Sequence, residues 1–237
     1  MTQTPRERAR RQTMEDIVRI GREHLATEGA AALSLRAVAR DLGVVSSAVY
    51  RYVKSRDELL TLLVIDGYTG LGDAVDAAVD KAAANDFPAQ FRALGRAVRS
   101  WAVAEPARYG LLFGSPVPGY QAPADQTTGP GTRVIGQLVR IIEGAYRSGA
   151  LVPGRGTLPA DNGTLAADFA AIRAEWGITG DDDTMARCIL VWAALFGAVN
   201  FEVFGQYGHA TFTDPAVLYE AQLASLARLA GFREPGN

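Results

Sequence analysis

The most informative chemistry in this sequence is a cluster of hydrogen-bond donors with no acidic residue among them. From 46 to 54 the chain reads SSAVYRYVK, in which hydroxyl and cationic groups are interleaved with apolar residues. Val49 and Val53 have the spacing of one buried helix face, so the polar residues point outward. Donors of this kind suit a polyanion that is held by charge and read by hydrogen bonds. The outward-facing residues are Ser46, Ser47, Tyr50, Arg51, Tyr52 and Lys54.

The residues before this cluster predict another helix and a tight turn. Apolar residues recur at helical spacing over 35–42, and Ser34 precedes them as an N-cap whose hydroxyl can accept from a free backbone N–H. Gly43 ends the helix because glycine adopts a left-handed conformation without steric cost. Together the two helices predict a helix–turn–helix, whose second helix reads base edges in DNA.

A capping box predicts where the following helix begins. In the run SRDE at 55–58, the Ser55 hydroxyl bonds forward and the Glu58 carboxylate bonds back. The positive N-terminal end of that helix is therefore expected near the DNA backbone.

Three runs carry a resemblance to a known family: LGV at 42–44, YRYVK at 50–54 and the capping box at 55–58. In order and spacing they resemble the DNA-binding domain of TetR-family transcriptional regulators, over about Thr13–Leu63. The resemblance implies double-stranded DNA as a partner; a helical hairpin without a nucleic-acid partner is the competing interpretation. The residues expected to contact DNA are Arg10, Arg11, Ser34, Arg36, Ser46, Ser47, Tyr50, Arg51, Tyr52 and Lys54.

Charge is distributed unevenly along the 237-residue chain, whose formal net charge is −2. Residues 1–56 carry 11 Lys/Arg and 6 Asp/Glu, whereas residues 57–237 carry 13 and 20. The first segment has a net charge of +5 and the second −7, so attraction to phosphate is confined to one end. We expect two domains, a helix–turn–helix DNA-binding domain at 1–56 and a helical effector-binding and dimerisation domain at 57–237.

Helical periodicity continues through the rest of the chain, so we expect an all-α fold. Residues 1–12 are expected to be a disordered tail or a flexible arm that reaches DNA, with the first helix from about Thr13 to Glu28. The Pro/Gly-rich residues 115–131 predict an irregular loop. Glycines 67, 70 and 72 mark either a hinge or close packing in a helix that runs from the capping box toward Ala84. The later helices are expected at 87–104, 134–149, 165–176, 184–204 and from 215, with a short buried helix or turn at 107–114.

The segment 184–204 is too apolar for an ordinary surface helix. From Cys188 to Val199 it has no charged or strongly polar residue, so it must be covered on all sides. Asp214-Pro215 then predicts the start of a last helix with a second wide apolar stripe. Pairing of these helices with their copies predicts a homodimer through about 184–204 and 215–230. Its recognition helices, about 34 Å apart, would read a palindrome.

A looser resemblance covers the C-terminal part. Ala107–Tyr120 and Trp192–Phe204 are similar to the C-terminal domain of the WHG-type TetR subfamily, in which Trp is followed shortly by His-Gly. Trp192 and Gly197 are present here, but Phe196 stands where that histidine would be. No ligand role of that histidine is therefore carried over.

The family resemblance implies a small-molecule effector that binds within about 85–205 and changes the separation of the recognition helices through the fourth helix. Aromatic residues outnumber charged ones among the candidate contacts, which favours an apolar or amphipathic effector. The alternative is that each aromatic residue belongs to the core. The candidate effector contacts are Trp101, Tyr109, Phe113, Trp176, Trp192, Phe196 and Asn200, with Glu202 as a further polar group.

Catalytic and cofactor motifs are not found in the sequence. No Gly-x-Ser-x-Gly, phosphate loop, His-Glu-x-x-His or Cys-x-x-Cys occurs, and two histidines and one cysteine are too few for a protein-only zinc site. We therefore expect no enzyme, no cofactor and no bound metal. The single cysteine and the lack of a signal core or a membrane-spanning run favour the cytoplasm.

The resulting prediction is a homodimeric repressor that a small effector releases from palindromic DNA. The alternative is a helical small-molecule-binding protein or enzyme with a vestigial helix–turn–helix.

Overall fold

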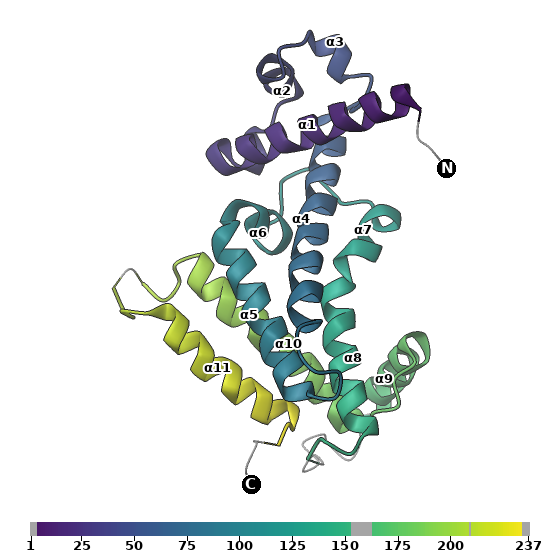
Figure 1. Ribbon diagram of the computed structural model, residues 1–237, viewed down its shortest axis with the longest axis vertical. Coiled ribbons are helices and arrows are strands. Elements are labelled where there is room, and N and C mark those ends of the chain that lie inside the picture. Colours follow the sequence, from purple (N-terminus) through teal and green to yellow (C-terminus); the bar gives the residue numbers. More distant parts are fainter. Residues whose placement is uncertain (1–3, 153–162, 209, 234–237) are drawn as a thin grey trace. The chain divides into compact units, whose positions relative to one another are not determined.

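The computed structural model describes residues 4–152, 163–208 and 210–233 (Figure 1). These residues form eleven α-helices, one 3-10 turn and an isolated antiparallel bridge between Leu151 and Phe232. The all-α fold expected from the sequence is confirmed. The chain divides into two compact units, one of residues 1–70 and 102–131 and the other of residues 71–101 and 132–237.

The first unit contains the helix–turn–helix. Its elements are α1 (Pro5–Glu28), η1 (Ala30–Ala32), α2 (Leu35–Asp41), α3 (Ser46–Val49), the beginning of α4 (Arg56–Val79), α6 (Pro106–Phe113) and α7 (Ala124–Gly131). The second unit contains the end of α4 and most of α5 (Phe87–Ala104), together with α8 (Arg133–Arg147), α9 (Gly163–Trp176), α10 (Asp182–Val203) and α11 (Pro215–Ala230). The boundary between the two packing units therefore falls within α4, between residues 70 and 71. The functional division expected at residue 56 stays a prediction.

The core of the first unit joins α1 to α2, α3 and α4. Ile17 and Ile20 of α1 are buried together with Val38, Val49 and the apolar start of α4. His24 belongs to the same core, and its Nε2 lies 2.6 Å from Asp41 Oδ2 at the end of α2. This hydrogen bond lowers the pKa of Asp41 and fixes the end of α2 against α1.

Local capping fixes the start of α4 and the turn before α3. Glu58 N–H donates to Ser55 Oγ at 3.1 Å, and the Glu58 carboxylate accepts from the Lys54 N–H at 2.6 Å. Gly43 has a φ of +72°, as the turn requires. Ser34 is the N-cap residue of α2, but its side chain makes no capping hydrogen bond, so that part of the sequence prediction is wrong.

The expectation of a disordered tail or flexible arm is wrong for residues 5–12, which belong to α1. Thr4 Oγ1 accepts from the Glu7 N–H at 3.3 Å, and the Glu7 carboxylate accepts from the Thr4 N–H at 2.8 Å. Pro5 occupies the first helical position, where its missing N–H costs nothing. This capping box was visible in the sequence and was overlooked; residues 1–3 lie outside the described part.

The irregular loop expected at 115–131 is interrupted by α7. The Pro123 carbonyl accepts from the N–H groups of Gln126 and Thr127 and from the Thr127 hydroxyl. Gly131 lies so close to Tyr68 that an added Cβ would be 3.3 Å from the ring. Packing of this kind overrides weak helix propensity, which is why Pro130 in the last turn did not prevent the helix.

The glycines of α4 serve close packing. Helix α4 is continuous from Arg56 to Val79. A Cβ at Gly67 would lie 3.3 Å from Leu112, and one at Gly72 would lie 2.8 Å from the Arg133 guanidinium. These contacts favour the close-packing alternative over a hinge.

Helix α10 is the centre of the second unit. It packs against α8, α9 and α11, and Val191, Leu195 and Val199 are fully buried in these contacts (Figure 1). Among the described residues, α10 is the one helix long and apolar enough to cross a membrane. One such helix is weak evidence for a membrane span, because core helices pass the same test.

A buried ion pair joins α5 to α10. The Arg99 guanidinium donates to both carboxylate oxygens of Glu202, at 2.7 and 2.5 Å, and the two side chains are only 20% and 14% exposed. Glu202 was expected as a polar group for the effector and is instead engaged by Arg99. The same helix carries a matched pair, Arg96 with Glu220, which has the same two-pronged geometry but is 56% and 45% exposed.

We predict that Arg99→Ala lowers the free energy of unfolding by about 3 kcal/mol, because it leaves Glu202 charged and poorly hydrated. The control Arg96→Ala should cost at most about 1 kcal/mol, since solvent screens an exposed pair. Urea denaturation followed by circular dichroism measures both. Equal losses for the two variants would show that burial does not distinguish the pairs.

Candidate DNA-binding surface and ligand cavity

The second helix of the helix–turn–helix presents unpaired donors to solvent. Val49 and Val53 anchor the segment in the core, at 1% and 0% exposed, and Tyr50 on the other side is 44% exposed. The segment 42–54 contains no carboxylate, so no neighbouring acid in it neutralises these donors. Six predicted DNA contacts have no side-chain hydrogen bond or ion pair within the described residues, namely Arg36, Ser46, Ser47, Tyr50, Arg51 and Lys54.

The other predicted DNA contacts lie beside this segment or near it. The Arg10 guanidinium lies over the Tyr52 ring, 5.9 Å from its centroid, so the start of α1 meets the end of the recognition segment. Ser34 and Arg36 line a shallow depression together with Tyr50. Arg11 forms an exposed ion pair with Glu15 at 3.6 Å.

Arg56 also borders this depression, but its role is structural. Its guanidinium donates to the carbonyl oxygens of Ala30 and Ala31 at 3.0 and 3.2 Å. It therefore ties the start of α4 to the turn after α1.

The predicted effector contacts do not form one group. Tyr109 is fully buried in the first unit, where its ring centroid lies 5.0 Å from that of Phe113. Burial raises the pKa of Tyr109. Phe113 also meets Tyr68 edge to face, at 6.1 Å, so Tyr109 and Phe113 pack in a core. Trp101 of α5 and Asn200 of α10 are half-buried in the second unit.

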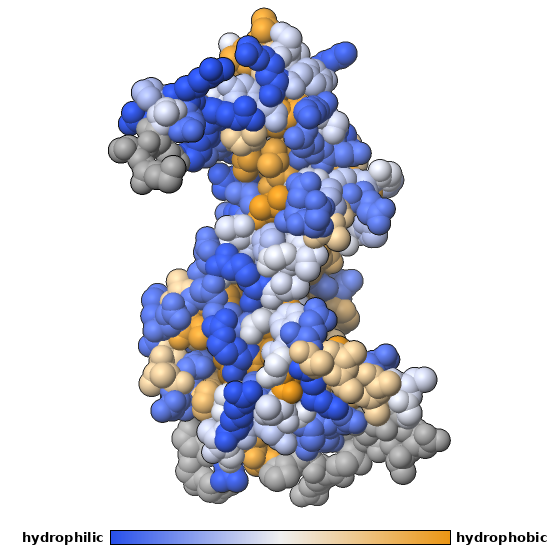
Figure 2. Space-filling view, turned by 90° about the vertical axis from the view of Figure 1, so that its right-hand side faces the viewer, coloured by the Kyte–Doolittle hydropathy of each residue, from blue (hydrophilic) through white to orange (hydrophobic). Residues whose placement is uncertain are grey.

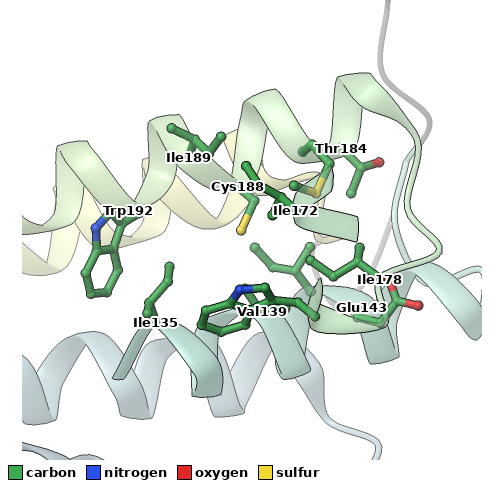
Figure 3. Close-up of a pocket in the computed structure, with 12 residues that line it drawn as sticks. Ile135, Val139, Glu143, Ile172, Ile178, Thr184, Cys188, Ile189 and Trp192 are labelled. Carbon is green, nitrogen blue, oxygen red and sulfur yellow. The ribbon is translucent and has the colours of Figure 1, made fainter. Parts of the chain in front are cut away.

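A cavity of about 300 Å³ lies between α8, α9 and α10 (Figure 3). Trp176 and Trp192, two of the candidate effector contacts, line it. Phe196 does not line it; its ring centroid lies 4.3 Å from that of Trp192, with the rings tilted by 48°. The rest of the wall is mainly aliphatic. These residues could not be identified from the sequence, because the same apolar pattern occurs in cavity walls and in solid cores. The further lining residues are Ile135, Val139, Ile142, Glu143, Ile172, Ile178, Thr184, Met185, Cys188 and Ile189.

The polar groups of the cavity are already satisfied or protonated. The Glu143 carboxylate accepts from the backbone N–H groups of Thr179 and Gly180, at 3.0 and 3.2 Å, and from Arg147 Nε at 2.6 Å. Burial opposes ionisation of Glu143, but these donors outweigh it and lower its pKa. Burial raises the pKa of the Cys188 thiol to about 11. The cavity therefore suits a neutral apolar molecule better than an anion, and its thiol is a weak nucleophile near neutral pH.

Helix α8 connects this cavity to α4. Ile135 and Val139 line the cavity, whereas Arg133 and Gln137 bind α4. The Arg133 guanidinium lies 2.8 Å from Asp73 and 2.6 Å from Asp76. The approach is possible because Gly72 has no side chain.

A groove lies along α10 and α11, and an added Cβ at Gly197 in its wall would meet nothing within 4 Å. The small residues Ala194, Gly197, Ala198, Ala221 and Ser225 line it together with Phe201, Tyr207, Gln222 and Leu226. Large apolar side chains lie exposed on the same two helices, with Leu190 at 52%, Phe201 at 48% and Val217 at 66%. Leu223 of α11 is buried inside the protomer, at 1% exposed, whereas Leu226, at 8% exposed, also lines the groove.

No three His, Cys, Asp or Glu side chains are placed to hold a metal ion in the part of the chain that the structure describes. His209 lies outside that part.

Comparisons with known proteins agree with the helix–turn–helix. The family model for bacterial regulatory proteins of the tetR family matches residues 13–63, and the model for the tetracyclin repressor-like C-terminal domain matches residues 91–226. The narrower WHG-type resemblance stays a prediction.

Whole-chain relatives extend this agreement. The chain is 50% identical over 214 residues to the HTH-type transcriptional regulators Rv1816 of Mycobacterium tuberculosis and Mb1846 of Mycobacterium bovis, covering 90% of each chain. The crystal structure of SCO4313, described as a regulatory protein, matches with a TM-score of 0.75 and 34% identity, covering 94% of this chain and 98% of that one. The chain therefore belongs to the TetR family, and it is a transcriptional regulator with a DNA-binding helix–turn–helix.

Proposed function

We propose that the protein is a homodimeric repressor that binds a palindromic operator and is released by a small neutral apolar effector. The observation that carries the DNA part is the exposed donor surface of α3 and the segment after it. Ser47, Tyr50 and Arg51 face solvent without partners in the described chain, so their donors are free to bind base edges and phosphates. Arg10, Arg36 and Lys54 supply cations around it for phosphate.

The cavity between α8, α9 and α10 supports the effector part. Its volume of about 300 Å³ is at the lower end of ligand sites, and its walls are almost wholly apolar. Occupancy would press on α8, which holds Asp73 and Asp76 of α4 through Arg133. Helix α4 begins at the capping box that follows the recognition segment, so a shift of α8 offers a route to DNA affinity.

The groove on α10 and α11 supports the dimer. Open space lies beside Gly197, because an added Cβ there would meet no atom within 4 Å. The exposed Leu190 and Phe201 lie on the same helix. Helices with small residues at their contact can approach closely, and a twofold axis would pair each groove with its copy. Two such protomers in the cytoplasm would present two recognition helices to one face of DNA.

The alternative is a helical small-molecule-binding protein or enzyme with a vestigial helix–turn–helix. It assumes that the donor surface of the recognition segment has lost the ability to bind DNA. No observation favours that reading over the regulator.

For DNA binding, duplexes are first selected from a random pool at about 0.15 M salt, where non-specific binding is weak. We expect a palindrome to be enriched. Lys54→Ala should then weaken binding to all sequences, because it removes a phosphate contact. The slope of log affinity against log salt concentration should become shallower by about one. Tyr50→Ala should weaken binding to the selected operator by about 1–3 kcal/mol. Fluorescence anisotropy measures both.

Lys81→Ala is the matched control, since Lys81 is exposed beyond the end of α4 and outside the donor surface. Unchanged operator affinity for both Tyr50→Ala and Lys54→Ala would exclude this surface as the DNA contact.

For the effector cavity, we expect the neutral fluorophore N-phenyl-1-naphthylamine to bind one per protomer and to receive energy from Trp176 and Trp192. The anionic analogue 1-anilinonaphthalene-8-sulfonate should bind at least about tenfold more weakly, because ionised Glu143 repels it and the wall is apolar. Cys188→Phe fills the cavity and should abolish energy transfer. Val103→Phe, at a position that is 48% exposed on α5 and outside the cavity wall, should leave it unchanged. Equal binding by both variants would place the probe elsewhere.

For the dimer, Gly197→Glu should give folded monomers at micromolar concentration in analytical ultracentrifugation, because it puts a charge into an apolar contact. Gly197→Ala should keep the monomer at least as stable, since alanine favours helix by about 1 kcal/mol over glycine. A persistent dimer of Gly197→Glu would move the interface away from this groove.

A further inference from the structure

The turn between α2 and α3 exposes a valine where a helix normally begins with a capping residue. Val45 is the N-cap residue of α3, and its side chain makes no capping hydrogen bond. Serine, threonine, aspartate and asparagine satisfy a free N–H at this position, and valine is among the least favoured residues there. The local rule for starting a helix is therefore broken at this residue.

Val45 also contributes little to packing. It is 72% exposed, and Val44 beside it is 40% exposed, whereas Val49 one turn later is 1% exposed. Figure 2 shows a hydrophobic spot at the top of the view, over the α2–α3 segment, next to hydrophilic side chains. Within the protomer, neither capping nor burial accounts for a valine at this position.

The surroundings indicate what the exposed valines contact. The neighbouring Ser46, Ser47 and Arg51 can donate hydrogen bonds, and no acidic residue occurs from 42 to 54. Two valines form a patch far smaller than a protein–protein interface needs. The partner should therefore carry an apolar group of about methyl size, which matches the small patch. It should also carry hydrogen-bond acceptors and phosphates around that group, which match the donors and cations beside the patch.

The DNA major groove offers one such group. Thymine presents a C5-methyl group there, beside base-edge acceptors, and apolar side chains contact it. In a helix–turn–helix the N-terminal end of the second helix is the part that reaches base edges. Val45 lies at that end, directly before Ser46 and Ser47.

We propose that Val45, with Val44 beside it, recognises the methyl group of a thymine in each operator half-site. This inference rests on the proposed function, since it requires that the protein selects a palindromic operator. Val45 is then a specificity-determining residue, and the broken capping rule reflects selection for contact with DNA.

The test removes one methyl group from the DNA. In the selected operator, each thymine of a half-site is replaced in turn by deoxyuridine, which keeps base pairing and lacks only the C5-methyl group. At one position the wild-type protein should bind about fourfold more weakly, the loss expected for one buried methyl group. Substitution in both half-sites should weaken binding about 15-fold.

The matching protein change is Val45→Ser, which removes the apolar contact and restores a capping hydroxyl. Its melting temperature should equal or exceed that of the wild type, so loss of folding cannot explain its behaviour. It should bind the thymine operator about fourfold more weakly per half-site and show no further loss with deoxyuridine. Val103→Ser, at a valine that is 48% exposed on α5, should retain the full deoxyuridine penalty.

Three results would overturn the inference. Wild-type binding that is insensitive to deoxyuridine at every position would show that no thymine methyl is read. An equal penalty for the wild type and Val45→Ser would assign the methyl contact to another residue. If no sequence is enriched from the random pool, the proposed operator binding fails as well, which separates that outcome from the first two.

Discussion

From Cys188 to Val199, helix α10 has no charged or strongly polar residue to offer to water, and the second unit is built around covering this run. Val191, Leu195 and Val199 are covered by the neighbouring helices of the same protomer. Beside Cys188 and Trp192 the cover is incomplete, and the cavity remains there. On its outer side, Leu190 and Phe201 stay exposed. One shortage of polar residues thus underlies both the ligand and the dimer proposals, because an apolar surface in water favours a further partner.

The DNA-binding unit follows a different constraint. It has a small core, so the positions of its helices depend on local hydrogen bonds such as His24–Asp41 and the Ser55–Glu58 cap. None of these hydrogen bonds uses a donor side chain of the recognition segment. A rigid frame with unpaired donors loses little conformational entropy when it meets phosphate and base edges.

Much of this fold could be predicted from the sequence, because periodicity and caps are local signals. The bounds of α5 and the Asp214 cap of α11 follow directly from such signals. Helix α7 could not be predicted, because its own residues are rich in Pro and Gly, and the contact of Gly131 with Tyr68 is not visible in the sequence. The ion pair of Glu202 could not be predicted for a similar reason, since its partner Arg99 lies 103 residues earlier in the chain. The donor residues of the recognition segment were identifiable because their chemistry is unusual; the aliphatic cavity wall was not, because its chemistry is common.

In the proposed regulation, the position of α8 implies that cavity occupancy alone would not be enough. One face of α8 lines the cavity through Ile135 and Val139, and another holds α4 through Arg133. A ligand shifts an equilibrium only by the difference between its affinities for the two states. A molecule that fits the cavity without displacing α8 would bind equally well in both states and leave DNA affinity unchanged. The size of an effector, relative to a cavity of about 300 Å³, therefore decides its effect as much as its polarity does.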